Sequence, residues 1–111
     1  MSLIEVLFEH QLTMKMFHFQ TAKYSAHKES DAYLVKYEKN LDRFMEVMQG
    51  NGRLQNKTIE LQFPVVNDST IDQHLTNMLN YLNSIKSNEL NVIRDEMVAD
   101  IQQLRYLLTF N

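Results

Sequence analysis

The sequence has no cysteine, no tryptophan, one proline and two glycines among its 111 residues. Without cysteine, a disulfide framework, thiolate metal ligands and a cysteine nucleophile are excluded. So little proline and glycine leaves few turn signals, and a few long regular elements are expected. Hydrophobic residues (44%) and charged residues (23%) occur in ordinary globular proportions. The length suits a single domain, 1–111, with one core.

The sequence also has no excess of basic charge. The net charge is −3 and the sequence pI about 5.7, and no basic run or tail is present, which disfavours direct nucleic-acid binding. The first five residues lack the features of a signal peptide. No apolar stretch approaches the ~20 residues that span a membrane. We therefore expect a soluble, cytoplasmic protein without a membrane partner, in a virion or host cytoplasm if the source is viral.

Four stretches repeat apolar residues at helical spacing and predict an all-α fold. The predicted helices cover about 3–19, 26–49, 69–86 and 89–109. Gly50 and Gly52 are natural terminators of the second helix. In the third, apolar residues alternate four and three apart, as the seam of a bundle requires. The sequence thus predicts a four-helix bundle.

The start of the third helix carries a capping signal. Ser69 is followed three residues later by Asp72, which is the spacing of a capping box with Asp in place of Glu. Asp68 adds negative charge near the same helix N-terminus.

Between the second and third helices, apolar and polar residues alternate over 57–66 with the period of a strand. A lone strand has no ladder partner in a helical chain. This arm (residues 57–66) therefore either lies extended over the bundle or pairs with a second copy. Four helices with one long crossover have ferritin-like connectivity.

The second predicted helix carries the pattern H-x3-D-x10-D-x3-E, formed by His27, Asp31, Asp42 and Glu46. At roughly 100° per residue, the four side chains fall within a stripe about 100° wide at the margin of the apolar face. Glu38 lies on the same stripe, so three carboxylates stand at successive i, i+4 positions and repel one another. A bound cation would offset this repulsion.

The spacing also excludes one metal centre on one helix, because Asp31 and Asp42 are about 16 Å apart along the axis. For all four residues to act together, two copies must lie antiparallel about a two-fold axis near Lys36 and Tyr37. His18, at the end of the first helix, would join this cluster. Two histidines and three carboxylates suit iron, manganese or zinc.

The segment from His18 to Glu46 resembles the ferroxidase motif of the Dps-like miniferritins. The match covers His18, His27, Asp31, Asp42 and Glu46, and the local run His18-Phe19 resembles the family's His-Trp. The resemblance implies a ferritin-like bundle with an iron site between two-fold-related subunits, a shell of subunits, and oxidation of ferrous iron by peroxide. The chain looks closest to short phage and large-DNA-virus proteins with a similar motif. It differs from the family in a shorter gap between His18 and His27, in the strand-like crossover and in lacking a basic tail.

Simpler interpretations stand beside the metal site. The stripe also suits a solvated helix face, with Asp42 paired to Lys39 and Glu46 to Arg43. We expect His10 to lie at the core margin, hydrogen-bonded to a neighbour, and His74 to be exposed. The methionines and tyrosines are best explained by packing.

Two functions follow. The first is a metal-binding protein that oxidises or stores iron, with manganese and zinc as further candidates, at a two-fold interface on the second helix. The second is a structural or interaction protein that keeps the bundle and the dimer without the chemistry. In that case the 57–66 arm would bind a protein partner by strand addition.

Overall fold

The computed structural model describes residues 2–55 and 57–110, and within them the regular structure is entirely helical. Its α-helices are α1 (Leu3–Gln20), α2 (Tyr24–Met48), α3 (Ile71–Asn83) and α4 (Asn91–Leu107), with a short 3₁₀ turn, η1 (Gln49–Asn51), after α2. The prediction of an all-α helical bundle is confirmed.

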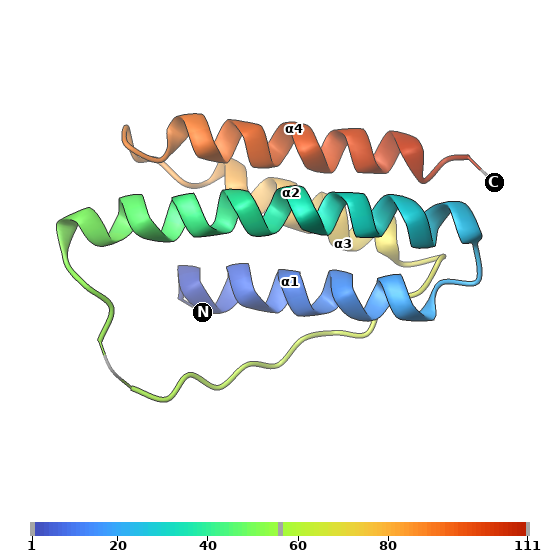
Figure 1. Cartoon of the computed structure of the whole chain (residues 1–111), viewed down its shortest axis with the longest axis horizontal. Coiled ribbons are helices and arrows are strands. Elements are labelled where there is room, and N and C mark those ends of the chain that lie inside the picture. The colour runs from blue at the N-terminus through green and yellow to red at the C-terminus, as the bar shows by residue number, and fades with distance from the viewer. Residues whose placement is uncertain (1, 56, 111) are drawn as a thin grey trace.

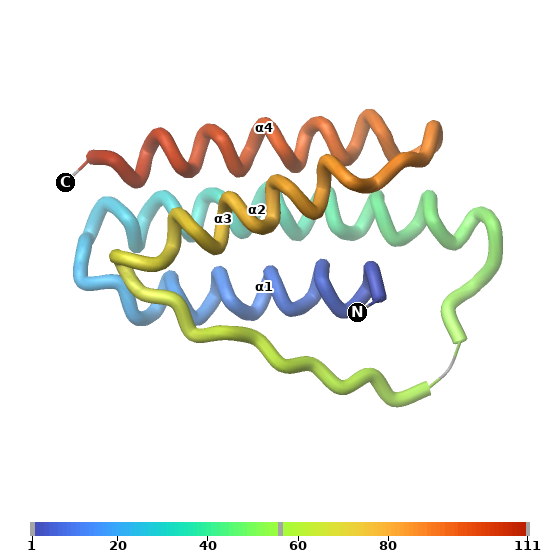
Figure 2. Tube along the Cα trace, turned by 180° about the vertical axis from the view of Figure 1, so that it is seen from behind, coloured from blue at the N-terminus to red at the C-terminus, as the bar shows by residue number. Residues whose placement is uncertain are grey.

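The helices form two antiparallel hairpins, α1 with α2 and α3 with α4 (Figure 1). A long connection leaves α2 at one end and enters α3 at the other, so α2 and α3 run in the same direction (Figure 2). The molecule measures 44 × 29 × 21 Å along its principal axes. This arrangement is the connectivity expected from one long crossover.

A single hydrophobic cluster joins all four helices. Its fully buried members include Leu7 and Phe17 of α1, Phe44 of α2, Leu82 of α3 and Ile101 of α4. These side chains lie on the apolar stripes of their helices, so burial of those stripes is what holds the bundle together.

The start of α1 and the end of the helical segment after α2 are explained by local chemistry. The hydroxyl of Ser2 accepts a hydrogen bond from the Glu5 amide at 3.3 Å and caps α1. After η1 the chain turns at Gly52, whose φ of 149° is rarely adopted by residues with a side chain. Gly52 therefore ends the second helical segment, as predicted.

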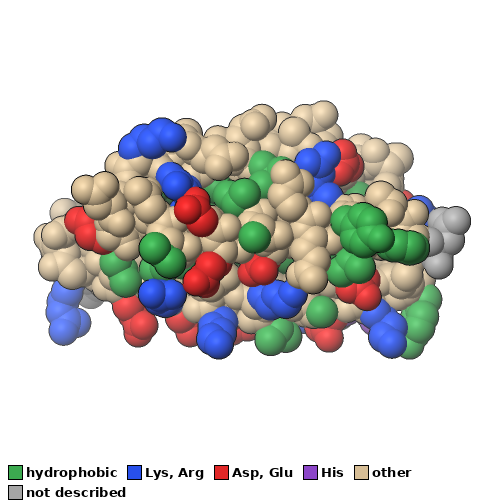
Figure 3. Space-filling model, turned by 90° about the horizontal axis from the view of Figure 1, so that it is seen from above, with side chains coloured by type: hydrophobic (Ala, Val, Ile, Leu, Met, Phe, Trp, Pro, Cys, Tyr) green, Lys and Arg blue, Asp and Glu red, His purple; other side chains and the backbone are tan. Residues whose placement is uncertain are grey.

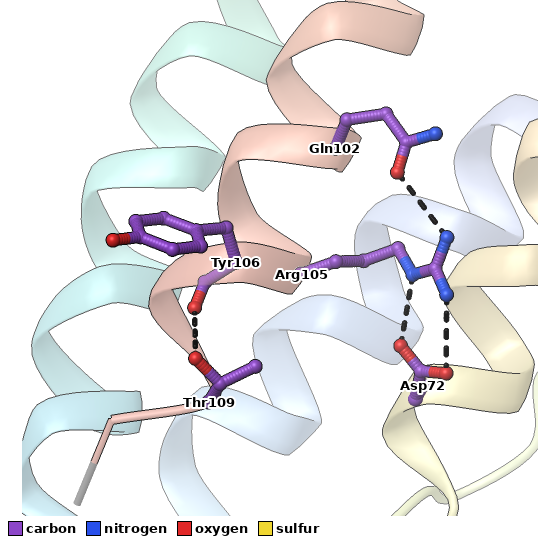
Figure 4. Close-up of polar contacts among 5 residues, drawn as sticks. All are labelled: Asp72, Gln102, Arg105, Tyr106 and Thr109. Carbon is purple, nitrogen blue, oxygen red and sulfur yellow. Dashed lines mark hydrogen bonds and ion pairs between the residues drawn. The ribbon is translucent and has the colours of Figure 1, made fainter.

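The predicted capping box before α3 is wrong. Ser69 donates its hydroxyl to the Asn67 side chain, and Thr70 occupies the N-cap position without a side-chain cap bond. Asp72 turns away to Arg105 on α4, where Nε lies 2.8 Å from Oδ1 and Nη2 lies 3.3 Å from Oδ2 (Figure 4). This two-pronged bond lowers the pKa of the Asp72 carboxyl. It orients α3 against α4, but its exposure limits what it adds to stability.

The 57–66 arm is extended and forms no strand in the described residues. It runs beside α1 along the length of the bundle (Figures 1 and 2). Leu61 and Phe63 are half-buried and Val66 is buried, and the Gln62 amide donates to Glu9 Oε1 at 3.0 Å. Of the two arrangements expected for the arm, a single chain adopts the one in which it lies over the bundle.

The face formed by α4 carries interspersed acidic and basic side chains (Figure 3). Hydrophobic side chains gather on this face near the C-terminal end. There, Tyr106 and Phe110 are 63% and 51% exposed and their rings meet edge to face with centroids 5.2 Å apart. None of the helices in the part of the chain that the structure describes is long and apolar enough to cross a membrane.

Candidate metal centre

His18 and His27 face each other across the α1–α2 turn. Their rings are stacked, with centroids 4.0 Å apart and planes inclined by 13°. The Nδ1 of each ring lies 2.8 Å from the backbone carbonyl oxygen of the other residue. His18 Nδ1 also lies 3.1 Å from the hydroxyl of Ser30, which itself donates to the His27 carbonyl oxygen. The two histidines are thus locked together by reciprocal bonds.

These bonds select one tautomer of each ring. A carbonyl oxygen only accepts, so both Nδ1 atoms carry their proton, and in the neutral ring the lone pair is on Nε2. Neither Nε2 has a hydrogen-bond partner among residues 2–55 and 57–110. Histidines that bind metals are oriented in this way, with one nitrogen on a backbone carbonyl and the other facing the ion.

Asp31 lies one turn after His27 and lines the same surface hollow as the two histidines, together with Tyr24 and Lys28. His18 is buried, whereas His27 and Asp31 are exposed. One chain therefore brings three of the predicted ligands to one hollow near the turn. We call His18, His27 and Asp31 the histidine half-site.

Asp42 and Glu46 line a second hollow further along α2, with Glu38 and with Phe8 of α1. All three carboxylates are exposed. We call Glu38, Asp42 and Glu46 the carboxylate half-site.

The two ion pairs expected on this helix face, Asp42 with Lys39 and Glu46 with Arg43, are not observed in the described residues. No ion pair within 4.0 Å reaches Asp42 or Glu46 in the described ranges. Arg43, the partner expected for Glu46, instead points across to α4 and lies 3.8 Å from Glu96. The carboxylates of the stripe therefore keep their mutual repulsion.

The two half-sites of one chain do not meet, because about 16 Å of helix separates Asp31 from Asp42. Within the described residues of one chain, no three His, Asp or Glu side chains converge closely enough to hold a metal ion. Joining the predicted ligands requires a second copy.

Most of the chain, including the two half-sites, matches a known protein family. Residues 18–108 match a protein family described as a family of unknown function, DUF5856. The chain belongs to this family. The matched residues begin at His18 and include every residue of both half-sites, whereas most of α1 lies outside. The DUF5856 description assigns no activity, and no curated protein and no solved structure matches the chain.

A second histidine cluster lies inside the bundle of this DUF5856 chain. His10 is 2% exposed, and its Nδ1 lies 2.9 Å from Nε2 of His74 while its Nε2 lies 2.8 Å from the Tyr33 hydroxyl. Hydrogen bonding of His10 to a neighbour was predicted, but the residue is deeper than the core margin. The expectation that His74 is exposed is wrong, because it packs half-buried against His10.

Burial governs the ionisation of this cluster. Desolvation, with a smaller effect of His74, holds the pKa of His10 well below its usual value. Desolvation also lowers the pKa of His74. It raises the pKa of Tyr33 well above the ordinary phenol value, with further contributions from Tyr37 and Asp100. The cluster is therefore neutral at physiological pH and acts as a set of core hydrogen bonds.

Two features near the histidine half-site were not predicted from the sequence. Ser30 is fully buried and bridges His18 to the His27 carbonyl. Its position three residues after His27 was the available signal, since a serine hydroxyl on a helix reaches back one turn. Asp68 contacts the α1–α2 turn from the far end of the crossover, and no local pattern indicates a contact over that separation.

Proposed function

We propose that this protein binds transition-metal ions between two copies of the chain, with iron as the principal candidate. The observation that carries the proposal is the reciprocal bonding of His18 and His27, which leaves both Nε2 lone pairs without partners in the described chain. The resemblance to the Dps-like ferroxidase motif supports the same residues. Manganese and zinc are the alternative ions.

The chemistry of the donor set suits such ions, whereas the described side chains of one chain do not converge on a single point. Two imidazole nitrogens and Asp31 come from one copy, and Asp42 and Glu46 would come from the other. Nitrogen and carboxylate oxygen donors in this ratio suit iron, manganese and zinc. A bound ion would also relieve the repulsion along α2, because two of its unpaired carboxylates would share a positive charge.

The surface around the stripe favours the two-fold arrangement. Val35 is 67% exposed and lies on the stripe, between Asp31 and Glu38. It is close to the axis expected near Lys36, so the two copies of Val35 would meet when the half-sites join. Phe8 lines the hollow of the carboxylate half-site and would extend this apolar contact.

When bound, ferrous iron would supply one electron per ion to peroxide. The side chains of the two half-sites would hold and orient the iron. His18 and His27 would present Nε2 from fixed rings. The carboxylates would bind the ion and balance its charge. Iron oxidation and storage are the activities that the resemblance to the Dps-like motif implies.

The first test is elemental analysis of protein purified without chelator, on a fraction sized by light scattering. Near-stoichiometric iron, manganese or zinc in a dimer or larger assembly is the expected result. Metal titration of His27→Ala and of the double variant Asp42→Ala/Glu46→Ala should show lost binding. The matched control is Glu29→Ala, which removes a carboxylate from the α4 side of the same helix.

A metal-free protein that stays so after anaerobic addition of ferrous iron would contradict the proposal. Loss of binding in Glu29→Ala equal to that in the double variant would also count against the assigned ligands. If binding is found, peroxide-driven oxidation of ferrous iron, followed optically, tests the ferroxidase activity.

A second candidate function is protein interaction through the 57–66 arm, as in a phage or virus component. Within the described part of the arm, only the amides of Lys57 and Gln62 donate hydrogen bonds. Ile59 and Val65 are 43% and 61% exposed. An extended segment with unpaired backbone groups is a template for strand addition. Ile59→Pro should weaken partner capture without affecting metal binding, and the opposite pattern would reject this candidate.

A further inference from the structure

The turn between α1 and α2 is short and is held from outside. It consists of Thr21, Ala22 and Lys23, between the last residue of α1 and the first of α2. The Thr21 hydroxyl donates to Asp68 Oδ1, and the Ala22 amide donates to Asp68 Oδ2 at 3.1 Å. The Thr21 oxygen in turn accepts the Lys23 amide at 3.2 Å. One carboxylate thus binds two of the three residues of the turn directly, and the third through Thr21.

Asp68 places a carboxylate beside the N-terminus of α2, where it binds the amide of Ala22, two residues before the helix begins. The N-cap residue of α2 is Lys23, which makes no side-chain cap bond, and the first turn of α2 has no acidic residue. A carboxylate beside a helix N-terminus is stabilising because the exposed amides carry partial positive charge. Here the carboxylate comes from the end of the crossover that follows the 57–66 arm.

The turn sets the relation between the two histidines. His18 is three residues before Thr21, and His27 is four residues after Lys23. Their two reciprocal hydrogen bonds, each 2.8 Å long, join the last turn of α1 to the first turn of α2. A small shift of one helix end along or about its axis would break both bonds, because each carbonyl is fixed to its own helix.

We propose that Asp68 is a positioning residue for the histidine half-site, which acts by fixing the turn that keeps His18 and His27 in register. This inference rests on the proposed metal-binding function. It also gives the crossover a role, since the carboxylate at its end orients metal ligands that it does not touch.

The test uses the full chain with Asp68→Ala, Asp68→Asn and Thr21→Val. The control is Glu60→Ala, which removes an exposed carboxylate from the same crossover. The first readout is the ring ¹⁵N resonances of His18 and His27 in metal-free protein, which report the tautomer. The second is affinity for Zn²⁺ and Fe²⁺. Thermal melting checks that each variant is folded.

In the parent and in Glu60→Ala, both rings should be protonated on Nδ1 and bare on Nε2. In Asp68→Ala the two tautomers should mix, and metal affinity should fall by up to the about 10- to 100-fold that is lost when a direct outer-shell partner of a metal ligand is removed. Asp68→Asn keeps one acceptor oxygen and should recover part of the loss. Thr21→Val removes one of the two donors and should lie between the parent and Asp68→Ala.

Unchanged tautomers and unchanged affinity in a folded Asp68→Ala would overturn the inference and leave the metal site standing. Absence of metal binding in the parent would reject the proposed function, and with it the role of Asp68 toward a metal. Mixed tautomers in Asp68→Ala would then still show that Asp68 sets the histidine register. Equal losses in Asp68→Asn and Asp68→Ala would contradict the role of the acceptor oxygen.

Discussion

His10 on α1 and His74 on α3 share one hydrogen bond, with Nδ1 of the first 2.9 Å from Nε2 of the second and the two ring planes inclined by 10°. Since each ring is neutral in the folded state, the bond needs only one proton between the two nitrogens. A second proton at this contact would put a positive charge inside the bundle and set two N–H donors against each other. The pair therefore couples the stability of the fold to pH.

The sign of this coupling follows from the lowered pKa of both residues. Burial keeps His10 and His74 neutral below the pH at which the unfolded chain takes up protons, about 6.5. Their contribution to stability is complete above that pH and is lost as the pH falls below it. Urea unfolding at pH 8.0, 6.5 and 5.5 should show this decline. His10→Leu should flatten the pH dependence, and an unchanged slope in a folded variant would contradict it.

Tyr37 tests a single buried hydrogen bond. Its hydroxyl donates to the Leu7 carbonyl oxygen at 2.6 Å, and burial raises its pKa far above the usual phenol value. Tyr37→Phe removes the donor without changing the packed ring and should cost about 0.5–1.5 kcal/mol in urea unfolding. The control, Tyr106→Phe, alters an exposed ring. A loss as large in the control would show that the buried bond is not the cause.

Leu82 tests the packing of α3. Its side chain is fully buried in the cluster shared by all four helices. Leu82→Ala should lower the free energy of unfolding by about 2–5 kcal/mol, because the lost apolar burial is compounded by a cavity. Val92→Ala, on a side chain 63% exposed, should change it by under about 0.5 kcal/mol. Similar values for the two would contradict the burial described for α3.

Metal binding should be visible as stabilisation. An ion that binds only folded protein adds about 2.7 kcal/mol when its free concentration is 100 times the dissociation constant. Differential scanning fluorimetry with Mn²⁺, Zn²⁺ or anaerobic Fe²⁺ should raise the melting temperature of the parent chain. His27→Ala should show no rise, and Glu29→Ala should respond like the parent. Because the site is shared, the effect should increase with protein concentration.

The apolar periodicity predicted the helices well because burial of one stripe decides the fold of a bundle. Leu75 and Leu82 of α3, and Ile93 and Ile101 of α4, are all buried at the predicted spacing. The ends were less predictable. α3 ends at Asn83, before the predicted 86, because the chain turns toward α4 from Ser84 onward.

Errors arose where a partner is distant in sequence. Asp72 was predicted to cap its own helix but bonds Arg105, and His74 was predicted to be exposed but bonds His10. Neither partner can be recognised from local spacing. The alternation over 57–66 correctly predicted an extended segment, and the absence of a neighbouring strand explains why no ladder forms in the described residues. Of the candidate site, the proximity of His18 and His27 followed from the short turn, whereas their reciprocal bonds required the structure.

The long crossover has a consequence for how the molecule tolerates a break in its chain. Two helical hairpins, 3–48 and 71–107, are joined by a connection whose first part is exposed on the surface. A protease cut near Leu54 would remove no core contact, and the two fragments would remain together as a non-covalent pair. Folding would then become a bimolecular reaction that responds to dilution. Mixing separately expressed hairpins should restore the bundle.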